Sequence, residues 1–206
     1  ASLDKKVDRL ETQLLANKAN TNYRIIGIGQ SKYSGNKRRR DFAPPNDTSF
    51  FGPDARFHGQ ADVFLQFIQD SVISVFDANS DKRILVGHSF GGLFAVYNST
   101  LHHSPFQHIY ALSPSLWVNY SSFVKQYISS DSLHIRVPLD ISYGSLEQLN
   151  LVGPAIQKLK KSITSTDSSL VNISSVKMKT HIYTFLLLIF PILMPVPFAI
   201  LFFCPA

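Results

Sequence analysis

The chain has 206 residues, of which 45% are hydrophobic and 17% charged, and these values fit one globular domain with a hydrophobic core. Much of its formal net charge of +6 comes from the run at residues 37–40, where no aromatic side chain is interleaved for base stacking. We therefore expect a solvated basic segment and no nucleic-acid partner. The chain has one cysteine, Cys204, so an internal disulfide cannot form.

Helix-like and strand-like segments alternate along the chain. Apolar residues at helical spacing predict helices at residues 4–16, 60–76, 90–101, 121–128 and 146–163. Short apolar runs predict strands at residues 23–29, 83–86, 108–112, 133–143 and 176–184, and a polar loop is predicted at 30–56. This alternation predicts an α/β domain over residues 1–184, with a mostly parallel sheet and helices on both faces.

The strongest local motif is Gly87-His88-Ser89-Phe90-Gly91, a G-x-S-x-G between a predicted strand and a predicted helix. A serine on such a tight turn leaves no space for neighbouring Cβ atoms, which explains the two glycines. The turn raises the serine hydroxyl above the sheet, and the next backbone N–H points to where an oxyanion would form. A chance match is the alternative, because the motif is short, but the flanking segments favour the functional interpretation. We therefore predict Ser89 as the nucleophile and the Phe90 amide as an oxyanion donor.

Four blocks of sequence carry a family resemblance. Residues 38–45 (RRRDFAPP) are similar to an R-x-R-D-[FLY]-T-P loop with Ala43 in place of Thr, and residues 58–65 (HGQADVFL) to a G-G-A-D-x-F-L helix start. Residues 87–97 contain the G-x-S-x-G, and residues 113–117 (SPSLW) match an S-P-S-L-W block. Together they resemble the putative-esterase family of the α/β-hydrolase superfamily, which includes enterochelin and salmochelin siderophore esterases and S-formylglutathione hydrolase-like enzymes. The resemblance runs over residues 3–184 and implies an α/β-hydrolase fold.

The resemblance also implies a function and a set of site residues. It implies a hydrolase of small-molecule carboxylic esters in which Ser89 forms an acyl-enzyme. Arg38 matches an arginine that lies near the oxyanion in the siderophore branch, with a plain surface charge as the alternative. Glu147 matches the family's G-x-x-E after a strand and is the expected acid, or an auxiliary group if a Ser–His pair suffices, whereas Asp140 is expected to be structural. No metal cluster or phosphate loop is visible in the sequence, and we expect no cofactor and no metal.

A catalytic histidine is not recognisable. A serine hydroxyl needs a base to attack near neutral pH, and the family supplies a histidine in a loop after the last strand. None of the seven histidines of this chain lies in such a loop. His181 falls within the predicted last strand, and His88 lies inside the G-x-S-x-G. The remaining ones come too early in chain order (His102, His103 and His108) or lack a matching context (His58 and His134).

The C-terminal segment takes the place of the loop that would hold this histidine. Residues 182–203 (IYTFLLLIFPILMPVPFAILFF) carry no charge and are long enough to span a bilayer, although three prolines interrupt them. The codons for residues 193–196 (LMPV), read one base earlier, permit His-Ala-Ser, which resembles the family's H-[GA]-S. We therefore interpret residues 185–206 as a frameshift product or as a transmembrane-like segment.

Two functions from different classes remain open. The first is a serine esterase, cytoplasmic or periplasmic as the family implies. The second is a catalytically inactive α/β-hydrolase-like protein that residues 182–203 anchor to a membrane. Because the chain has no initiator Met or signal peptide and ends in this apolar run, we expect an N-terminally truncated and C-terminally aberrant hydrolase.

Overall fold

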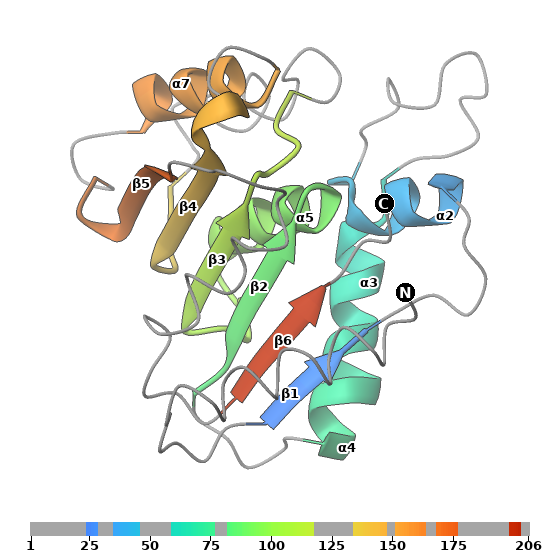
Figure 1. Cartoon of the computed structure of the whole chain (residues 1–206). Coiled ribbons are helices and arrows are strands. Elements are labelled where there is room, and N and C mark those ends of the chain that lie inside the picture. Colours follow the sequence, from blue (N-terminus) through green and yellow to red (C-terminus); the bar gives the residue numbers. More distant parts are fainter. Residues whose placement is uncertain are drawn as a thin grey trace, which may run out of the picture.

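Six parallel strands form one sheet in a computed structural model of the chain, which describes residues 24–28, 35–45, 59–76, 82–117, 134–147, 151–163, 168–176 and 198–202. The strands follow the order β1-β6-β2-β3-β4-β5 across the sheet (Figure 1). Every neighbouring pair is parallel, which confirms the predicted mostly parallel sheet. The strands are β1 (Arg24–Gly27), β2 (Ile84–His88), β3 (His108–Leu112), β4 (Leu139–Gly144), β5 (Val171–Val176) and β6 (Phe198–Phe202).

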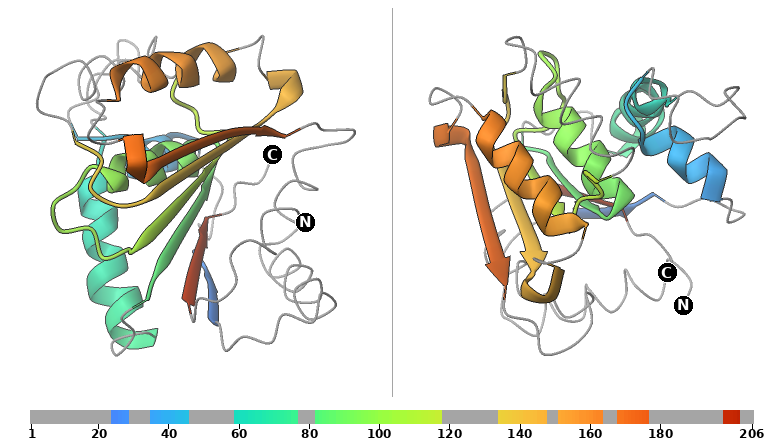
Figure 2. Two further views of the ribbon diagram at one scale, coloured as in Figure 1. Left: turned by 90° about the vertical axis from the view of Figure 1, so that its left-hand side faces the viewer. Right: turned by 90° about the horizontal axis from the view of Figure 1, so that it is seen from above.

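Three of the described helices pack on one face of this sheet. The helical elements are α2 (Gly35–Phe42), α3 (Ala61–Phe67), the π-helical turn η2 (Ile68–Ile73), α4 (Ser74–Phe76), α5 (Phe90–Ser99), η4 (Ser145–Glu147), α7 (Val152–Ser162) and η5 (Ser168–Leu170). Figure 2 shows α3, α5 and α7 on the same side of the strands. Leu85, Ile109 and Ile141 are fully buried in one hydrophobic core with residues of these helices. The helices predicted at residues 4–16 and 121–128 lie outside the described residues.

Helix α2 corrects one prediction, because it forms within residues 30–56, which the sequence indicates as a polar loop. Lysine and arginine have high helix propensity, so the basic run can form a helix once one side of it is buried. Phe42 provides that burial: its ring lies 5.4 Å from the ring of Phe64 and 5.8 Å from that of Phe94. The aromatic contacts thus hold α2 against α3 and α5.

Strand β4 is shorter than predicted, and β5 forms almost entirely at residues where the sequence indicates no strand. The strand predicted at 133–143 begins only at Leu139, because Pro138 has no N–H to donate to a neighbouring strand. Strand β5 forms at Val171–Val176, ahead of the strand predicted at 176–184, and residues 177–184 of that prediction lie outside the described residues. Its alternating polar residues weaken the hydrophobic signal, because β5 lies at the edge of the sheet and is partly exposed.

Strand β6 comes from the uncharged C-terminal segment and lies inside the sheet. It pairs with β1 on one side and with β2, the strand that precedes Ser89, on the other. Residues 177–197 and 203–206 lie outside the described residues. Within the described ranges, no helix is both long and apolar enough to cross a bilayer.

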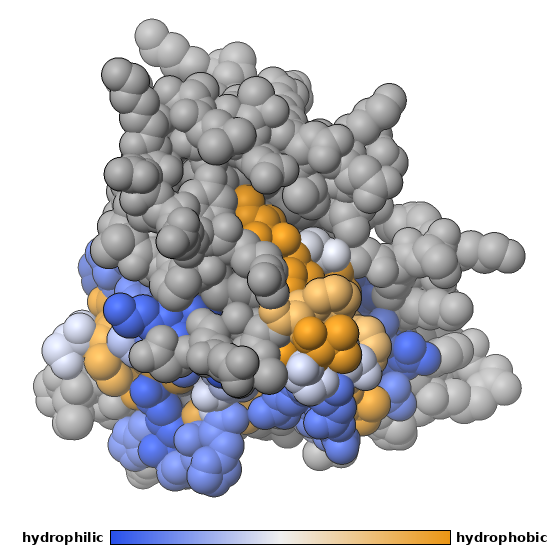
Figure 3. All heavy atoms as spheres, turned by 90° about the horizontal axis from the view of Figure 1, so that it is seen from below, coloured by the Kyte–Doolittle hydropathy of each residue, from blue (hydrophilic) through white to orange (hydrophobic). Residues whose placement is uncertain are grey.

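Aromatic residues continue from the core to the surface along α3. Phe64 packs on Phe94 at 5.3 Å in an edge-to-face arrangement, and Phe67 stacks on Phe64 at 6.1 Å. Phe67 and Val63, one helical turn apart, are each about half exposed. Apolar residues also reach the surface among hydrophilic ones on the side of the molecule that Figure 3 shows. This aromatic series fixes the position of α2, and with it the position of Arg38.

Candidate active site

Ser89 lies on a sharp turn between β2 and α5, as the motif predicts. Its backbone has φ 59° and ψ −115°, in the left-handed region that residues with a side chain rarely adopt. Gly87 and Gly91 meet at this turn, and a Cβ atom on Gly87 would lie 2.0 Å from the carbonyl oxygen of Gly91. Residue 87 must therefore be glycine, and the strained serine stands at the N-terminus of a ten-residue helix.

The last residue of β3 and the segment after it bind Ser89 through three hydrogen bonds. The N–H of Ser89 donates to the carbonyl of Leu112 at 3.0 Å, and the N–H of Ser115 donates to the carbonyl of Ser89 at 3.0 Å. The two serine hydroxyl oxygens lie 3.2 Å apart, and either can be the donor. The sequence singles out the S-P-S-L-W block but assigns no role to Ser115. Only the packing of this block against the turn reveals the contact.

Glu147 lies in η4, directly after β4, and two donors hold its carboxylate. The hydroxyl of Ser113 donates to its Oε2 at 2.6 Å, and the N–H of Gly144 donates to the same atom at 2.8 Å. Ser113 follows β3 and has a positive φ of 42°. Because β2, β3 and β4 are adjacent and parallel, their carboxyl ends bring Ser89, the 113–115 segment and Glu147 to one edge of the sheet.

Arg38 lies against the residue that follows the nucleophile. Its guanidinium carbon is 5.0 Å from the ring centroid of Phe90 and 6.0 Å from that of Phe42, within the range of cation–π contact. The end of α2 is tied to the start of α3, because the N–H of Gln60 donates to the carbonyl of Arg40 and that of Ala61 to the carbonyl of Ala43. These bonds fix the helix that carries Arg38.

Four of the histidines lie far from Ser89 in the described part of the chain. His108 is the first residue of β3 and pairs with Ile84, the first residue of β2. Four residues of strand, about 13 Å, therefore separate it from the carboxyl edge of the sheet, where Ser89 lies. His102 and His103 are exposed in the turn after the far end of α5. His134 lies two residues before Arg136, whose N–H donates to the carbonyl of Ser99 at that same end of α5. His58 and His181 lie outside the described residues. These four positions therefore do not supply a base to Ser89.

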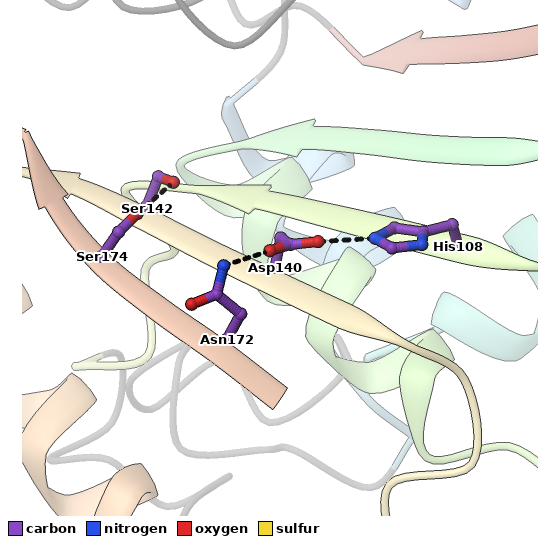
Figure 4. Close-up of polar contacts among 5 residues, drawn as sticks. All are labelled: His108, Asp140, Ser142, Asn172 and Ser174. Carbon is purple, nitrogen blue, oxygen red and sulfur yellow. Dashed lines mark hydrogen bonds and ion pairs between the residues drawn. The ribbon is translucent and has the colours of Figure 1, made fainter. Parts of the chain in front are cut away.

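Asp140 belongs to a separate polar cluster near the amino ends of β3, β4 and β5 (Figure 4). Its carboxylate accepts a 2.7 Å hydrogen bond from Asn172 and lies 2.5 Å from Nε2 of His108. Burial alone would raise the pKa of Asp140, but the hydrogen bonds from His108 and Asn172 and the charge of His108 outweigh it, so the pKa is lowered. Burial and the Asp140 charge raise the pKa of Tyr110 to about 12. Ser142 and Ser174 contact each other at 3.0 Å on the same two strands.

Comparison with known proteins places the chain in a family. A family model described as "Putative esterase" matches residues 18–153. The chain belongs to this family. Among curated relatives it is 37% identical over 129 residues to a siderophore enterobactin esterase of Emericella nidulans, covering 54% of this chain and 43% of that protein. It is 32% identical over 138 residues to a siderophore triacetylfusarinine C esterase of Aspergillus fumigatus, covering 60% of this chain and 46% of that protein. The chain thus spans less than half the length of these relatives.

Solved structures support the same fold. The siderophore hydrolase EstB from Aspergillus nidulans superposes with a TM-score of 0.59 at 23% identity, covering 77% of this chain and 63% of that one. The BES protein from Bacillus cereus superposes with a TM-score of 0.60 at 22% identity, covering 88% of this chain and 74% of that one. The predicted α/β-hydrolase fold is therefore confirmed.

Within the described residues, no group of three His, Cys, Asp or Glu side chains could hold a metal ion.

Proposed function

We propose that this chain carries the active-site core of a serine esterase that cleaves carboxylic esters through an acyl-enzyme on Ser89. The observation that carries the proposal is the strained turn at Ser89, with φ 59° between β2 and α5. Proteins tolerate such a conformation for a non-glycine residue where the surrounding structure enforces it, and often because the site has a function. The turn follows the carboxyl end of β2, and the hydroxyl of Ser89 lies 3.2 Å from that of Ser115.

In the proposed reaction, Ser89 Oγ forms a bond to the ester carbonyl carbon and its proton passes to a base. The carbonyl oxygen becomes an oxyanion, which accepts a hydrogen bond from the Phe90 N–H and is stabilised by Arg38. The C–O bond of the ester then breaks, the alcohol leaves with the proton, and water hydrolyses the acyl-enzyme. Glu147 would orient the basic histidine, which the family supplies after its last strand and which is not recognisable in this chain.

Siderophore esters are the substrate class we propose. The two curated relatives are named for enterobactin and triacetylfusarinine C, and the four sequence blocks resemble the putative-esterase family, which includes the siderophore esterases. Arg38 supports the assignment, because it matches the arginine that lies near the oxyanion in the siderophore branch and its guanidinium carbon lies 5.0 Å from the ring of Phe90, the residue after the nucleophile. The experiment incubates the purified chain with enterobactin, triacetylfusarinine C or p-nitrophenyl acetate, and it compares the rates at which the hydrolysis products appear.

Labelling of the nucleophile tests the proposal directly. A fluorophosphonate should modify the chain at Ser89, as located by peptide mass mapping, and Ser89→Ala should abolish both the label and any ester hydrolysis while the circular dichroism spectrum is kept. Activity that stays within about tenfold in Ser89→Ala would assign the nucleophile elsewhere. An unlabelled chain that sediments with membranes would instead favour the anchored, inactive hydrolase that the apolar residues 182–203 also suggest.

A further inference from the structure

We propose that Ser115 is a positioning residue for the nucleophile, holding the Ser89 hydroxyl in its reactive orientation. This inference rests on the proposed function. The starting observation is the 3.2 Å separation of the two hydroxyl oxygens, which come from residues 26 positions apart in the sequence. A serine side chain has three staggered rotamers, so a hydroxyl on a turn needs a neighbour that selects one of them. Ser115 provides this neighbour.

Ser115 is itself held in place. It is only 3% exposed, and its N–H donates to the carbonyl of Ser89, so the same residue is bound through its backbone and through its side chain. The segment also packs closely on the helix that Ser89 begins. A Cβ atom on Gly92 would lie 2.8 Å from Cα of Pro114, so the absence of a side chain at Gly92 lets the segment approach. Ser115 therefore has little freedom to leave the nucleophile.

The chemistry favours Ser115 as the donor in this contact. A hydroxyl has one proton to donate and two lone pairs to accept with. If Ser115 donates to Oγ of Ser89, the Ser89 proton remains directed to a base, and the Ser115 hydrogen bond strengthens as negative charge develops on Oγ. This role differs from that of the Phe90 amide, which would stabilise the carbonyl oxygen. Ser115 acts on the attacking atom.

A second serine pair in the same sheet provides a matched control. Ser142 and Ser174 also contact each other through their hydroxyl oxygens, at 3.0 Å, and Ser142 is buried like Ser115. Neither residue belongs to the turn that carries Ser89. Ser142→Ala therefore removes the same kind of contact from the same sheet and leaves the nucleophile untouched.

The experiment measures the rate of fluorophosphonate labelling at Ser89 in the full chain, by intact mass over hours, with Ser89→Ala as the background. Ser115→Ala should lower the second-order rate constant by about tenfold or more, the change expected for a lost hydrogen bond to a developing charge. Ser115→Thr, which keeps the hydroxyl, should recover part of the rate, and Ser142→Ala should label as the parent does. Labelling of Ser115→Ala at the parent rate would overturn the inference and leave the proposed function intact. Failure of the parent chain to label at Ser89 would overturn the proposed function, and the inference with it.

A second measurement needs no reactivity. Urea unfolding of Ser89→Ala, Ser115→Ala and the double variant forms a double-mutant cycle across the two hydroxyls. The change in the unfolding equilibrium constant in the double variant should differ by roughly threefold from the product of the single changes, because each single variant loses the same hydrogen bond. Multiplicative single effects would show that the hydroxyls do not interact, which would overturn the role of Ser115.

Discussion

The hydroxyl of Ser113 donates a 2.6 Å hydrogen bond to the carboxylate of Glu147, although the two residues are 34 positions apart in the sequence. Two residues later in the same segment, Ser115 contacts Ser89. One short segment after β3 thus holds both the predicted nucleophile and the predicted acid. We expect changes in this segment to alter reactivity more than they alter the fold.

Removal of the Ser113 hydroxyl tests the role of Glu147. Ser113→Ala leaves the carboxylate with the Gly144 N–H as its remaining described donor, so the acid loses a fixed orientation. In the chain whose residues after 184 are replaced so that a histidine lies near position 193, Glu147 would orient that histidine, and we expect Ser113→Ala to lower kcat for an aryl ester by about tenfold with KM little changed. If Ser113 acts through Glu147, the Ser113→Ala/Glu147→Gln double variant should be no slower than Glu147→Gln alone. Ser162→Ala on α7, whose hydroxyl bonds within its own helix, is the control. Independent effects in the double variant would contradict the coupling.

Arg38→Ala tests electrostatic stabilisation beside Phe90. If the guanidinium stabilises the oxyanion, kcat should fall by about 10²-fold, as for the loss of a single oxyanion donor. Arg38→Lys should recover only part of the rate, because an ammonium lacks the planar stacking of a guanidinium on Phe90 and Phe42. Arg39→Ala, in the same run but exposed, should keep the parent kcat. A change in KM alone would return Arg38 to the role of a surface charge.

The Asp140 cluster should make the free energy of unfolding depend on pH in the acid range. The pKa of Asp140 is lowered in the folded protein, so its contribution to stability is fully present above the unfolded-state value near 3.9 and is lost as the pH falls through the lower folded-state value. Asp140→Asn should therefore lower the free energy of unfolding at pH 6, and the difference from the parent should shrink towards pH 3. Urea unfolding across this range provides the measurement, with Asp62→Asn on the exposed side of α3 as a control. A constant difference between pH 6 and pH 3 would show that the carboxylate charge does not stabilise the fold.

The chain with its present C-terminal segment should hydrolyse esters very slowly, because a serine without a base stays protonated. Replacement of the residues after 184 by the alternative-frame sequence, which permits a histidine near position 193, should raise turnover of an aryl ester by several orders of magnitude. Thermal unfolding must be measured alongside, because the replacement removes β6 from between β1 and β2. Ordinary enzymatic rates in the present chain would identify one of its own histidines as the base. An intact reading frame in independent sequencing of the gene would rule out the frameshift.

The nucleophile turn and the alternation of strands and helices follow from the sequence by itself. Both depend on residues that are close along the chain: the close approach of Gly91 at the turn leaves no space for a Cβ atom on residue 87, and apolar periodicity marks the strand before the turn and the helix after it. Local conformational preferences act over such short distances, so the pattern is visible without the fold. Strand β5 shows the opposite case, because polar residues on an edge strand hide its periodicity.

Only the tertiary structure decided which distant groups meet at the site. The contacts of Ser89 with Ser115 and of Ser113 with Glu147 join segments 26 and 34 residues apart, and they exist because the parallel strands β2, β3 and β4 end side by side. Arg38 reaches Phe90 because the rings of Phe42, Phe64 and Phe94 pack α2 against α5. The position of β6 between β1 and β2 likewise depends on pairing with two strands that are far away in the sequence. Such contacts are set by strand order and packing, which composition and periodicity do not encode.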